Sequence, residues 1–262
     1  MALSQSALEQ ILAPIPWITG IHFFERLEST SSRVRDLAHT GAPAGSLVVA
    51  DGQSGGRGRK GRSWFSPPGV NLYFSILLRP AGLEHRHVPL ITLMAGVALC
   101  RGLQPLLKDR RATLKWPNDV LVNGHKVAGI LTEVSTTGRH VDYVILGVGV
   151  NVNQPTAMWP PDLQARATSL YAETGVVYPR AHVLFQVLSH LGAGYSSLLR
   201  GKRDECVAAW KRVSSTLGKP VRVQSGHEQL TGIARDVDAA GALVIERPDG
   251  TWHTVSTGDI LE

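Results

Sequence analysis

Cysteine is scarce in this sequence: the 262 residues include two, Cys100 and Cys206. They stand far apart and have no histidine neighbours at the spacing of metal ligands. The sequence therefore predicts neither a disulfide framework nor a zinc site. Such cysteine usage is typical of a reducing compartment, and we expect a cytoplasmic protein.

A secretory signal and a membrane segment are also lacking. The first ten residues have neither a basic start nor an apolar core. The longest nearly apolar run, residues 88–100, is shorter than the roughly 20 residues that cross a bilayer. We expect a soluble protein that does not bind membranes.

Acidic residues are absent from one stretch that is otherwise crowded with charge. Residues 55–64, Gly-Gly-Arg-Gly-Arg-Lys-Gly-Arg-Ser-Trp, hold four glycines and four cations. Glycine lets a backbone approach a ligand closely. Arginine binds phosphate or carboxylate through two N–H groups at once. The stretch therefore predicts an anion-binding loop, for which a polyphosphate nucleotide is the natural ligand.

The rest of the composition is that of a globular protein, with 43% hydrophobic and 18% charged residues. The formal net charge is +6, and the loop alone supplies four positive charges. Because the basic balance is partly local, it favours a small anionic ligand over DNA.

Two common nucleotide motifs are excluded. Gly56, Gly58 and Gly61 match the dinucleotide fingerprint as text, but that fingerprint opens a helix. Here the glycines run into residues 63–68, Ser-Trp-Phe-Ser-Pro-Pro, which cannot form a helix. The phosphate loop that ends in Gly-Lys-Ser/Thr is absent as well.

Hydrophobic periodicity and turn signals predict an α+β region followed by a small β domain. The Asn123-Gly124 pair is a strong hairpin signal within 119–134, and the proline-rich segment 154–165 is expected to be a loop. Other strands are expected at 21–27, 46–50, 71–78, 113–116 and 141–153, and helices at 6–12, after residues 29–32, and at 88–103, 180–199 and 204–213.

The character of the chain changes after residue 214. Short alternating runs follow, separated by glycine-containing turns, at 221–223, 230–234, 243–246 and 252–255. This pattern is typical of a small all-β barrel. We expect one domain at 1–214 and a second at 215–262.

Three further patterns have both a structural and a functional interpretation. Residues 29–32, Ser-Thr-Ser-Ser, follow Glu28. They are interpreted either as the N-cap of a helix or as a cluster that binds the polar head of a ligand. Residues 118–119, Asn-Asp after a proline, suit a turn or a Mg²⁺-nucleotide site. Lys126 is interpreted either as a solvent-exposed lysine of a strand or as a positive charge beside an anion that develops during a reaction.

Three motifs occur together in one order and spacing: residues 57–64 (Arg-Gly-Arg-Lys-Gly-Arg-Ser-Trp), 115–119 (Lys-Trp-Pro-Asn-Asp) and 126–131 (Lys-Val-Ala-Gly-Ile-Leu). Jointly they resemble biotin protein ligase (biotin–[acetyl-CoA carboxylase] ligase). Further agreement comes from residues 28–30, Gln53, 147–151 and 167–170. The resemblance runs from about residue 21 to the C-terminus.

The resemblance implies a catalytic domain with a mixed sheet, related to class II tRNA synthetases, and a C-terminal SH3-like barrel. It implies that biotin and MgATP form biotinyl-5′-AMP, which then biotinylates a lysine of a biotin carboxyl carrier protein, a part of a biotin-dependent carboxylase. ATP and biotin are substrates in this scheme, and Mg²⁺ accompanies the nucleotide.

The resemblance also assigns residues. Contact with biotin falls to Ser29, Thr30, Ser31, Gln53, Arg57, Gly58, Arg59, Lys126, Gly129, Leu131, Gly147 and Gly149. Contact with ATP falls to Arg59, Arg62, Asn118, Asp119, Lys126 and Asn151. Charge stabilisation and proton transfer fall to Lys126, Arg59, Arg57 and Asp119, with Asp119 also the candidate beside Mg²⁺.

Two features depart from the family. Ser31 stands where the family commonly has Asn, which puts the biotin contact of this residue in question. About 20 residues precede the first predicted strand, too few for the helix-turn-helix domain that some members carry. We therefore expect a ligase that binds no specific DNA and is not a repressor. Homodimerisation stays open.

Two rival functions are carried alongside. A lipoate–protein ligase shares the catalytic fold but lacks the arginine-rich loop of residues 57–62. A nucleic-acid-binding module could use that loop together with Trp64 and the small barrel. Such a module would not need residues 115–119 or the glycine pair Gly147 and Gly149.

Overall fold

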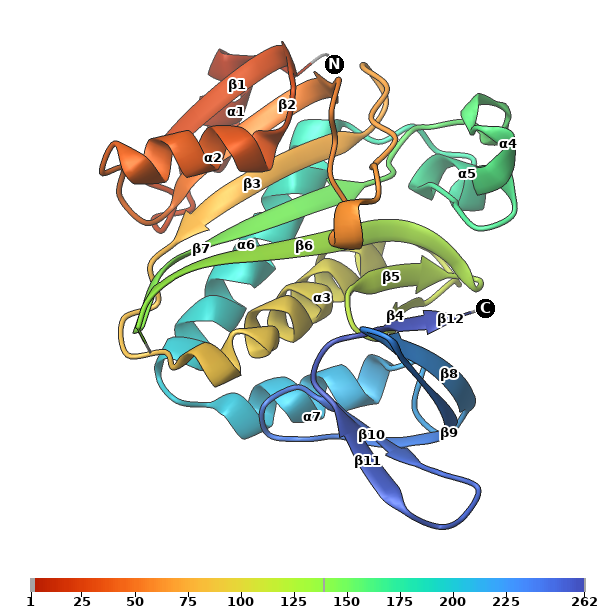
Figure 1. Ribbon diagram of the computed structural model, residues 1–262. Helices are drawn as coiled ribbons and strands as arrows, with labels where there is room; N and C mark the ends of the chain where they lie inside the picture. The colour runs from red at the N-terminus through yellow and green to blue at the C-terminus, as the bar shows by residue number, and fades with distance from the viewer. Residues whose placement is uncertain (1–2, 139, 262) are drawn as a thin grey trace.

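The chain is built around a seven-stranded sheet, with strand order β1-β2-β3-β7-β6-β5-β4 (Figure 1). The computed structural model describes residues 3–138 and 140–261. β1 and β2 run parallel and all other neighbours in this sheet are antiparallel, so the sheet is mixed. The strands are β1 (Gly20–Leu27), β2 (Ser46–Gln53), β3 (Leu72–Leu78), β4 (Ala112–Lys115), β5 (Asp119–Val122), β6 (His125–Thr137) and β7 (His140–Val150).

Helices cover both faces of this sheet because its central strands are apolar on both sides. Helix α2 (Thr30–His39) packs on one face, where Val34 meets Val48, Leu77 and Ile145. On the other face lie α3 (Pro89–Leu103), α6 (Arg180–Leu199) and α7 (Arg203–Val213) (Figure 1). The remaining helices are α1 (Gln5–Leu12), α4 (Pro161–Gln164) and α5 (Leu170–Thr174).

Helix α3 is the apolar centre of the domain that holds the mixed sheet. Nearly all of its residues are buried, which explains why the sequence shows no polar face there. The helical residues His85–Leu106 are long and apolar enough to cross a membrane by composition alone, with a mean hydropathy of 1.3. Since 72% of that window is buried inside the protein, the apolar surface of this helix is already covered by its own core.

The hairpin predicted at Asn123-Gly124 is confirmed. Both residues have positive φ, 50° and 82°, as the tight two-residue turn between β5 and β6 requires. Strands β6 and β7 then form a long antiparallel pair in which Gly129 faces Gly149 and Leu131 faces Gly147. This pair forms the floor on which the site is built.

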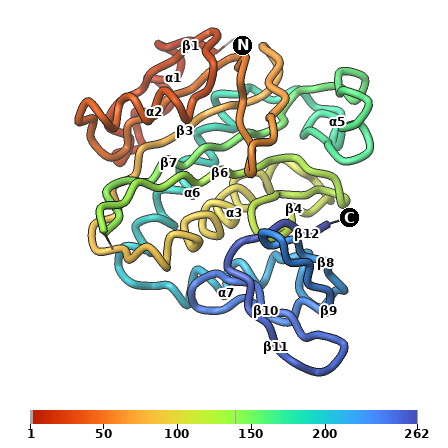
Figure 2. Tube along the Cα trace, in the orientation of Figure 1, coloured from red at the N-terminus to blue at the C-terminus, as the bar shows by residue number. Residues whose placement is uncertain are grey.

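The C-terminal strands form a second, antiparallel sheet with order β11-β10-β9-β8-β12. Figure 2 shows the last strand turning back toward the seven-stranded sheet. The strands are β8 (Pro220–Ser225), β9 (Glu228–Val237), β10 (Leu243–Glu246), β11 (Trp252–Val255) and β12 (Asp259–Leu261). The predicted combination of an α+β domain with a mixed sheet and a small C-terminal β domain is therefore confirmed.

Trp116 anchors the two sheets to each other. It is buried, its backbone N donates to Thr216 Oγ1 at 2.9 Å, and its ring Nε1 donates to Gly241 O at 3.2 Å. The motif around Trp116 thus fixes how the C-terminal domain sits beside the cleft.

The element predictions are confirmed apart from three details, of which the first is that the short helix α5 was not predicted. The segment 154–165 contains short helical turns, Thr156–Met158 and α4, where a loop was expected, because its prolines start turns as well as break helices. Strand β12 was not recognised as a strand of its own, because its three residues are too few to show a periodicity.

Candidate active site

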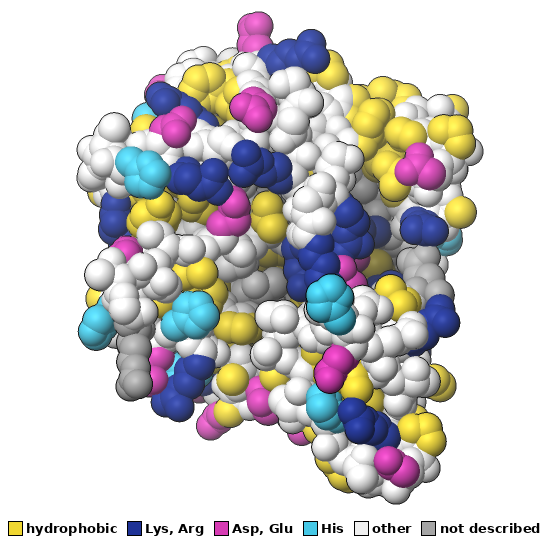
Figure 3. Space-filling model, in the orientation of Figure 1, with side chains coloured by type: hydrophobic (Ala, Val, Ile, Leu, Met, Phe, Trp, Pro, Cys, Tyr) yellow, Lys and Arg dark blue, Asp and Glu magenta, His cyan; other side chains and the backbone are white. Residues whose placement is uncertain are grey.

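A cleft of about 1340 Å³ opens between the mixed sheet, the glycine-arginine loop and the C-terminal domain. Every residue assigned above to biotin, ATP or catalysis lines it. Figure 3 shows Lys and Arg side chains gathered beside the hollow in the middle of this face. The structure therefore brings the separate sequence motifs into one site.

The glycine-arginine loop is a narrow hairpin that leans over the cleft. Gly58 N donates to Arg62 O at 2.6 Å, and Trp64 N donates to Gly56 O at 2.9 Å. Its tip is a single 3₁₀ turn, Arg59–Gly61, in which Lys60 has a φ of 54°. The exclusion of a dinucleotide-binding helix at this loop is confirmed.

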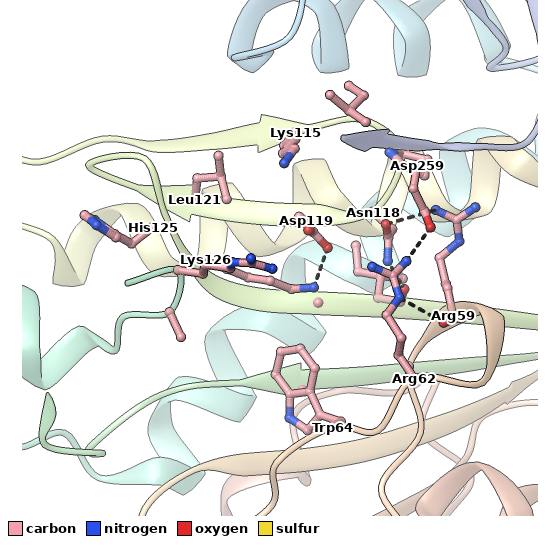
Figure 4. A pocket seen from close by; sticks show the side chains of 18 of the residues that line it. Arg59, Arg62, Trp64, Lys115, Asn118, Asp119, Leu121, His125, Lys126 and Asp259 are labelled. Atoms are coloured by element: carbon pink, nitrogen blue, oxygen red, sulfur yellow. Dashed lines mark hydrogen bonds and ion pairs between the residues drawn. The ribbon is translucent and has the colours of Figure 1, made fainter. Parts of the chain in front are cut away.

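Three cations of the loop share one acid from the C-terminal domain, and Figure 4 shows two of them, Arg59 and Arg62, beside Asp259. Asp259 accepts from Arg59 Nη1 at 3.0 Å and from Arg62 Nη2 at 2.5 Å. Lys60 Nζ lies 3.4 Å from the same carboxylate. The loop cations are therefore compensated by a protein carboxylate rather than left bare.

Arg59 is the most enclosed of these cations. Burial lowers the pKa of its guanidinium, and the adjacent Asp259 carboxylate acts in the opposite direction. Its Nη1 also donates to Asn118 Oδ1 at 3.3 Å and to Gly258 O at 3.1 Å. Because an arginine stays charged at any ordinary pH, this environment holds a partly desolvated positive charge at the cleft wall.

Lys126 and Asp119 form an ion pair in the middle of the cleft. Lys126 Nζ lies 2.6 Å from Asp119 Oδ1, and both side chains are partly exposed. The ammonium also lies 5.2 Å from the centre of the Trp64 ring, within the range of a cation–π contact. The lysine charge is thus aimed into the cleft instead of out to solvent.

Asn118 and Asn151 hold the backbone around this ion pair. Asn118 Nδ2 donates to Ile130 O at 2.8 Å, which ties the start of β5 to β6. Asn151 Nδ2 donates to Lys126 O at 3.2 Å and to Thr168 O at 3.0 Å, while its Oδ1 is buried and has no hydrogen-bond partner. An acceptor is therefore available at this end of the cleft.

The glycines of β6 and β7 make room for an aromatic side chain. A Cβ at Gly149 would lie 2.4 Å from Trp64 Cε2, and a Cβ at Gly129 would lie 2.7 Å from Trp64 Cζ3. Gly147 is similarly close to Ser31, whose Oγ would lie 2.7 Å from an added Cβ. These positions are occupied by glycine because side chains from the loop and from α2 lie directly on the sheet.

Hydroxyl groups converge at the start of α2. The Ser75 Oγ, buried on β3, lies 2.8 Å from Thr30 Oγ1 and 3.1 Å from Ser31 Oγ. Gln53 Oε1 accepts from Thr30 N at 2.9 Å, and its Nε2 donates to Ser66 Oγ at 3.0 Å. Ser29 occupies the N-cap position but its side chain makes no cap bond. Ser29, Thr30, Ser31 and Gln53 of this cluster line the cleft, so the segment does more than begin a helix.

Sequence reasoning missed Asp259 and Ser75 and gave Trp64 no role in a ligase. Asp259 has no local signal, because it follows a glycine in a short strand of the other domain. Ser75 lies in an apolar strand and resembles a packing residue. Trp64 belongs to the recognised loop motif, but its place over the glycines depends on tertiary structure.

Arg57 is the loop cation that the structure separates from the others. Its Nη1 lies 4.0 Å from Glu133 Oε1 on β6, whereas Arg59 and Arg62 turn toward Asp259. The predicted cations therefore line one cleft without forming a single cluster.

The fold and the cleft together define a class: an α+β catalytic domain of the class II tRNA synthetase type, joined to a small barrel. Residues 23–151 match the model of the biotin/lipoate A/B protein ligase family, and residues 216–261 match that of the biotin protein ligase C-terminal domain. The biotin–[acetyl-CoA-carboxylase] ligase of Mycobacterium tuberculosis is 34% identical over 238 residues, which cover 89% of this chain and 85% of that protein.

The bifunctional ligase/repressor BirA of Bacillus subtilis is also 34% identical, over 89% of this chain and 72% of its own length. Among solved structures, the biotin protein ligase of Aquifex aeolicus in complex with biotin and ATP superposes with a TM-score of 0.79. It is 30% identical, and the match covers 93% of this chain and 98% of that one. The chain belongs to the biotin protein ligase family, as the sequence motifs predicted.

Proposed function

We propose that this protein activates biotin with ATP as biotinyl-5′-AMP and transfers the biotinyl group to a lysine of a biotin carboxyl carrier protein. One observation carries the proposal: the arginine loop, the Lys126–Asp119 pair and the glycine-floored slot open into a single cleft. The Aquifex aeolicus relative was solved in complex with biotin and ATP, which supports the same pair of substrates here.

The chemistry requires charge compensation, because the carboxylate of biotin must approach a triphosphate. Arg57, Arg59, Arg62 and Lys126 are the cations that line the cleft at the loop and at its centre. Positioned cations in a partly dry site stabilise a developing anion more than the same charges do in water. No nucleophilic side chain is needed, so placement and electrostatics supply the rate.

In the first step, a carboxylate oxygen of biotin attacks the α-phosphorus of ATP. The bond between that phosphorus and the bridging oxygen breaks, and pyrophosphate leaves. We assign Lys126 to the charge on the α-phosphate and Arg59 and Arg62 to the nucleotide phosphates. For this, the phosphates must replace Asp259 as the partner of these arginines.

In the second step, the carrier lysine attacks the carbonyl carbon of the mixed anhydride, an amide bond forms and AMP leaves. The attacking amine loses a proton. Asp119 is our candidate acceptor, because it lies in the cleft 2.6 Å from Lys126 and a shift of Lys126 toward substrate would release its oxygen.

We assign the head of biotin to the hydroxyl cluster at α2, with its rings in the slot above Gly147 and Leu131. Thr30 and Ser31 line the cleft and offer hydroxyls that donate and accept, as a cyclic urea requires, and the buried Ser75 Oγ holds both of them. Ser31 is shorter than the asparagine common in the family, and its hydrogen bond to Ser75 keeps its oxygen close to the floor of the slot.

Magnesium is assigned to the nucleotide rather than to a protein cage. Among the residues that the structure describes, no group of three or more His, Cys, Asp or Glu side chains is arranged to hold a metal. Mg²⁺ favours one or two carboxylates together with phosphate oxygens, and Asp119 fits the carboxylate role. The ion would supply charge neutralisation of the phosphates when the nucleotide binds.

Further assignments follow the same family logic. We propose the domain boundary at residues 214–215, where Ser215 N donates to Leu114 O at 2.8 Å and the chain passes to the barrel. We also propose that the chain works in the cytoplasm and does not bind operator DNA or membranes. Whether two copies associate is an independent question that sedimentation can answer.

The proposal is tested by purified protein, biotin and MgATP, with pyrophosphate release as the readout. Competing biotin with lipoate separates the two enzymatic alternatives, because a biotin ligase should be inhibited little by lipoate. Absence of pyrophosphate release with biotin, or release with lipoate instead, would contradict the proposal.

A further inference from the structure

We infer that Glu133 is a positioning residue of the cleft, whose carboxylate holds Arg57 of the loop and Arg35 of α2 where the slot meets that helix. The inference rests on the proposed function, since it gives Arg57 its place beside the biotin slot. Glu133 does not line the cleft itself, so it acts through Arg57 rather than on the substrate.

The position of Glu133 follows from the period of the strand. Gly129, Leu131 and Glu133 are alternate residues of β6 and share one face. The first two face Gly149 and Gly147 and form the floor of the slot, whereas Glu133 faces Ile145. Because Ile145 packs beneath α2, Glu133 stands where the slot meets that helix.

One oxygen of this carboxylate serves two cations. Glu133 Oε1 lies 2.5 Å from Arg35 Nη2 and 4.0 Å from Arg57 Nη1. The second oxygen, Oε2, is buried and has no hydrogen-bond partner. A carboxylate that is partly removed from water needs compensation by charge, and the two arginines on either side provide it.

The long distance between Arg57 and Glu133 is compatible with a role of Arg57 in binding substrate. Arg35 anchors the carboxylate by the short contact, while Arg57 stays 42% exposed at the longer one. A bound substrate can therefore take Arg57 without breaking a tight pair, and Glu133 keeps the guanidinium from swinging into solvent. Among the described residues, the other loop cations pair with Asp259, so Glu133 is a second and separate point of attachment.

The first test is tryptic cleavage of the substrate-free protein, which does not depend on any activity. Glu133→Gln keeps the size of the side chain and removes its charge. We expect cleavage after Arg57 to be about three- to fivefold faster, the scale of a partly exposed ion pair. Cleavage after Arg62, which Asp259 holds, should be unchanged and serves as an internal control.

The second test is a double-mutant cycle with Arg57→Ala, measured as pyrophosphate release. Glu133→Gln alone should raise the KM for biotin about three- to fivefold with kcat changed less than about twofold. In the Arg57→Ala background the same substitution should have no further effect. A purely structural role would instead add in both backgrounds and lower the Tm.

Controls keep the outcome decisive. Glu246→Gln removes an ion pair with Arg235 that lies in the C-terminal sheet and outside the cleft, and it should change neither readout. If Glu133→Gln does not fold, Glu133→Asp keeps the charge, shortens its reach and should give the same selective change at Arg57. Unchanged cleavage at Arg57, or equal KM effects in both backgrounds, overturns the inference. A wild-type protein that releases no pyrophosphate contradicts the proposed function but leaves the cleavage test intact.

Discussion

Arg59 and Asp259 are 200 residues apart in the sequence, and their Nη1 and Oδ1 atoms meet at 3.0 Å. Asp259 belongs to β12 of the small C-terminal sheet, so this contact joins the anion loop to the second domain. The C-terminal domain therefore contributes to the charge balance of the cleft as well as to its wall. The phosphates of a nucleotide must compete with this carboxylate for Arg59 and Arg62.

Removing the charge of Asp259 should loosen the tip of the loop. In the Asp259→Asn variant we expect tryptic cleavage after Arg59 and Arg62 to be several-fold faster in the absence of substrate, because both lose their ion pair. Mass spectrometry of the peptides over a digestion time course measures this. Biotin with MgATP should protect both sites in the wild-type protein, and equal cleavage with and without substrate would contradict a loop that closes on its ligands.

Cleavage after Arg57 is the matched control for that experiment. Arg57 pairs with Glu133 rather than with Asp259, so the Asp259→Asn variant should leave its cleavage nearly unchanged. If all loop sites became equally sensitive, the loop would behave as one unit and the two separate attachments would be wrong.

Replacing Arg59 by alanine should slow adenylate formation. The guanidinium is partly buried at the cleft wall and lies beside Asp259, and we assign it to the phosphates of the nucleotide. Loss of one such preorganised charge costs roughly a hundredfold in rate. Pyrophosphate release measures it, with Arg86→Ala, an exposed arginine paired with Glu84, as the control. Near-normal release in Arg59→Ala would remove this loop from the mechanism.

Adding a methyl group at Gly149 should displace Trp64. The new Cβ would lie 2.4 Å from the indole ring, so we expect the free energy of unfolding to fall by about 1–3 kcal/mol and biotin binding to weaken. Urea denaturation measures the first effect and calorimetry the second. In a Trp64→Ala background the same substitution should lower the free energy of unfolding only slightly. An equal loss of stability in both backgrounds would mean that the methyl group clashes with the strand itself and not with the ring.

The two cysteines should be poor nucleophiles in the folded protein. Burial raises the pKa of the Cys100 thiol to about 12 and that of Cys206 to about 11, from an ordinary value of 9.0. For Cys206 this lowers the thiolate fraction at pH 8 by about 100-fold, since each pKa unit is a factor of ten.

Labelling with a thiol reagent tests this, and rapid reaction of the native protein would contradict it.

The raised pKa values of the two thiols also determine how the stability of the fold depends on pH. Because the folded-state pKa values lie above the unfolded ones, the neutral thiols stabilise the fold below about pH 9. That contribution is lost as the pH rises further.

Features that depend on local sequence could be predicted in advance. The turn at Asn123-Gly124 follows from the need for positive φ at both residues, and the helix at α3 follows from its continuous apolar run. The anion loop was recognisable from glycine and arginine alone, because both act through the backbone and charge of a single short segment.

Features that depend on partners far away in the sequence could not be predicted in advance. Asp259 meets Arg59 only because β12 returns to the catalytic sheet, and no pattern near either residue records that return. Likewise, the place of Trp64 over Gly149 and the pairing of Arg57 with Glu133 arise from packing between elements. Periodicity gives the face on which a side chain lies, but not which charge it will meet there.

The most direct measurement is mass spectrometry of a biotin carboxyl carrier domain after incubation with this protein, biotin and MgATP. We predict that the carrier gains the mass of one biotinyl group on a single lysine, that omission of ATP abolishes the gain, and that lipoate does not replace biotin. A carrier that stays unmodified while the protein is folded, or one that gains a lipoyl group instead, would contradict the central claim.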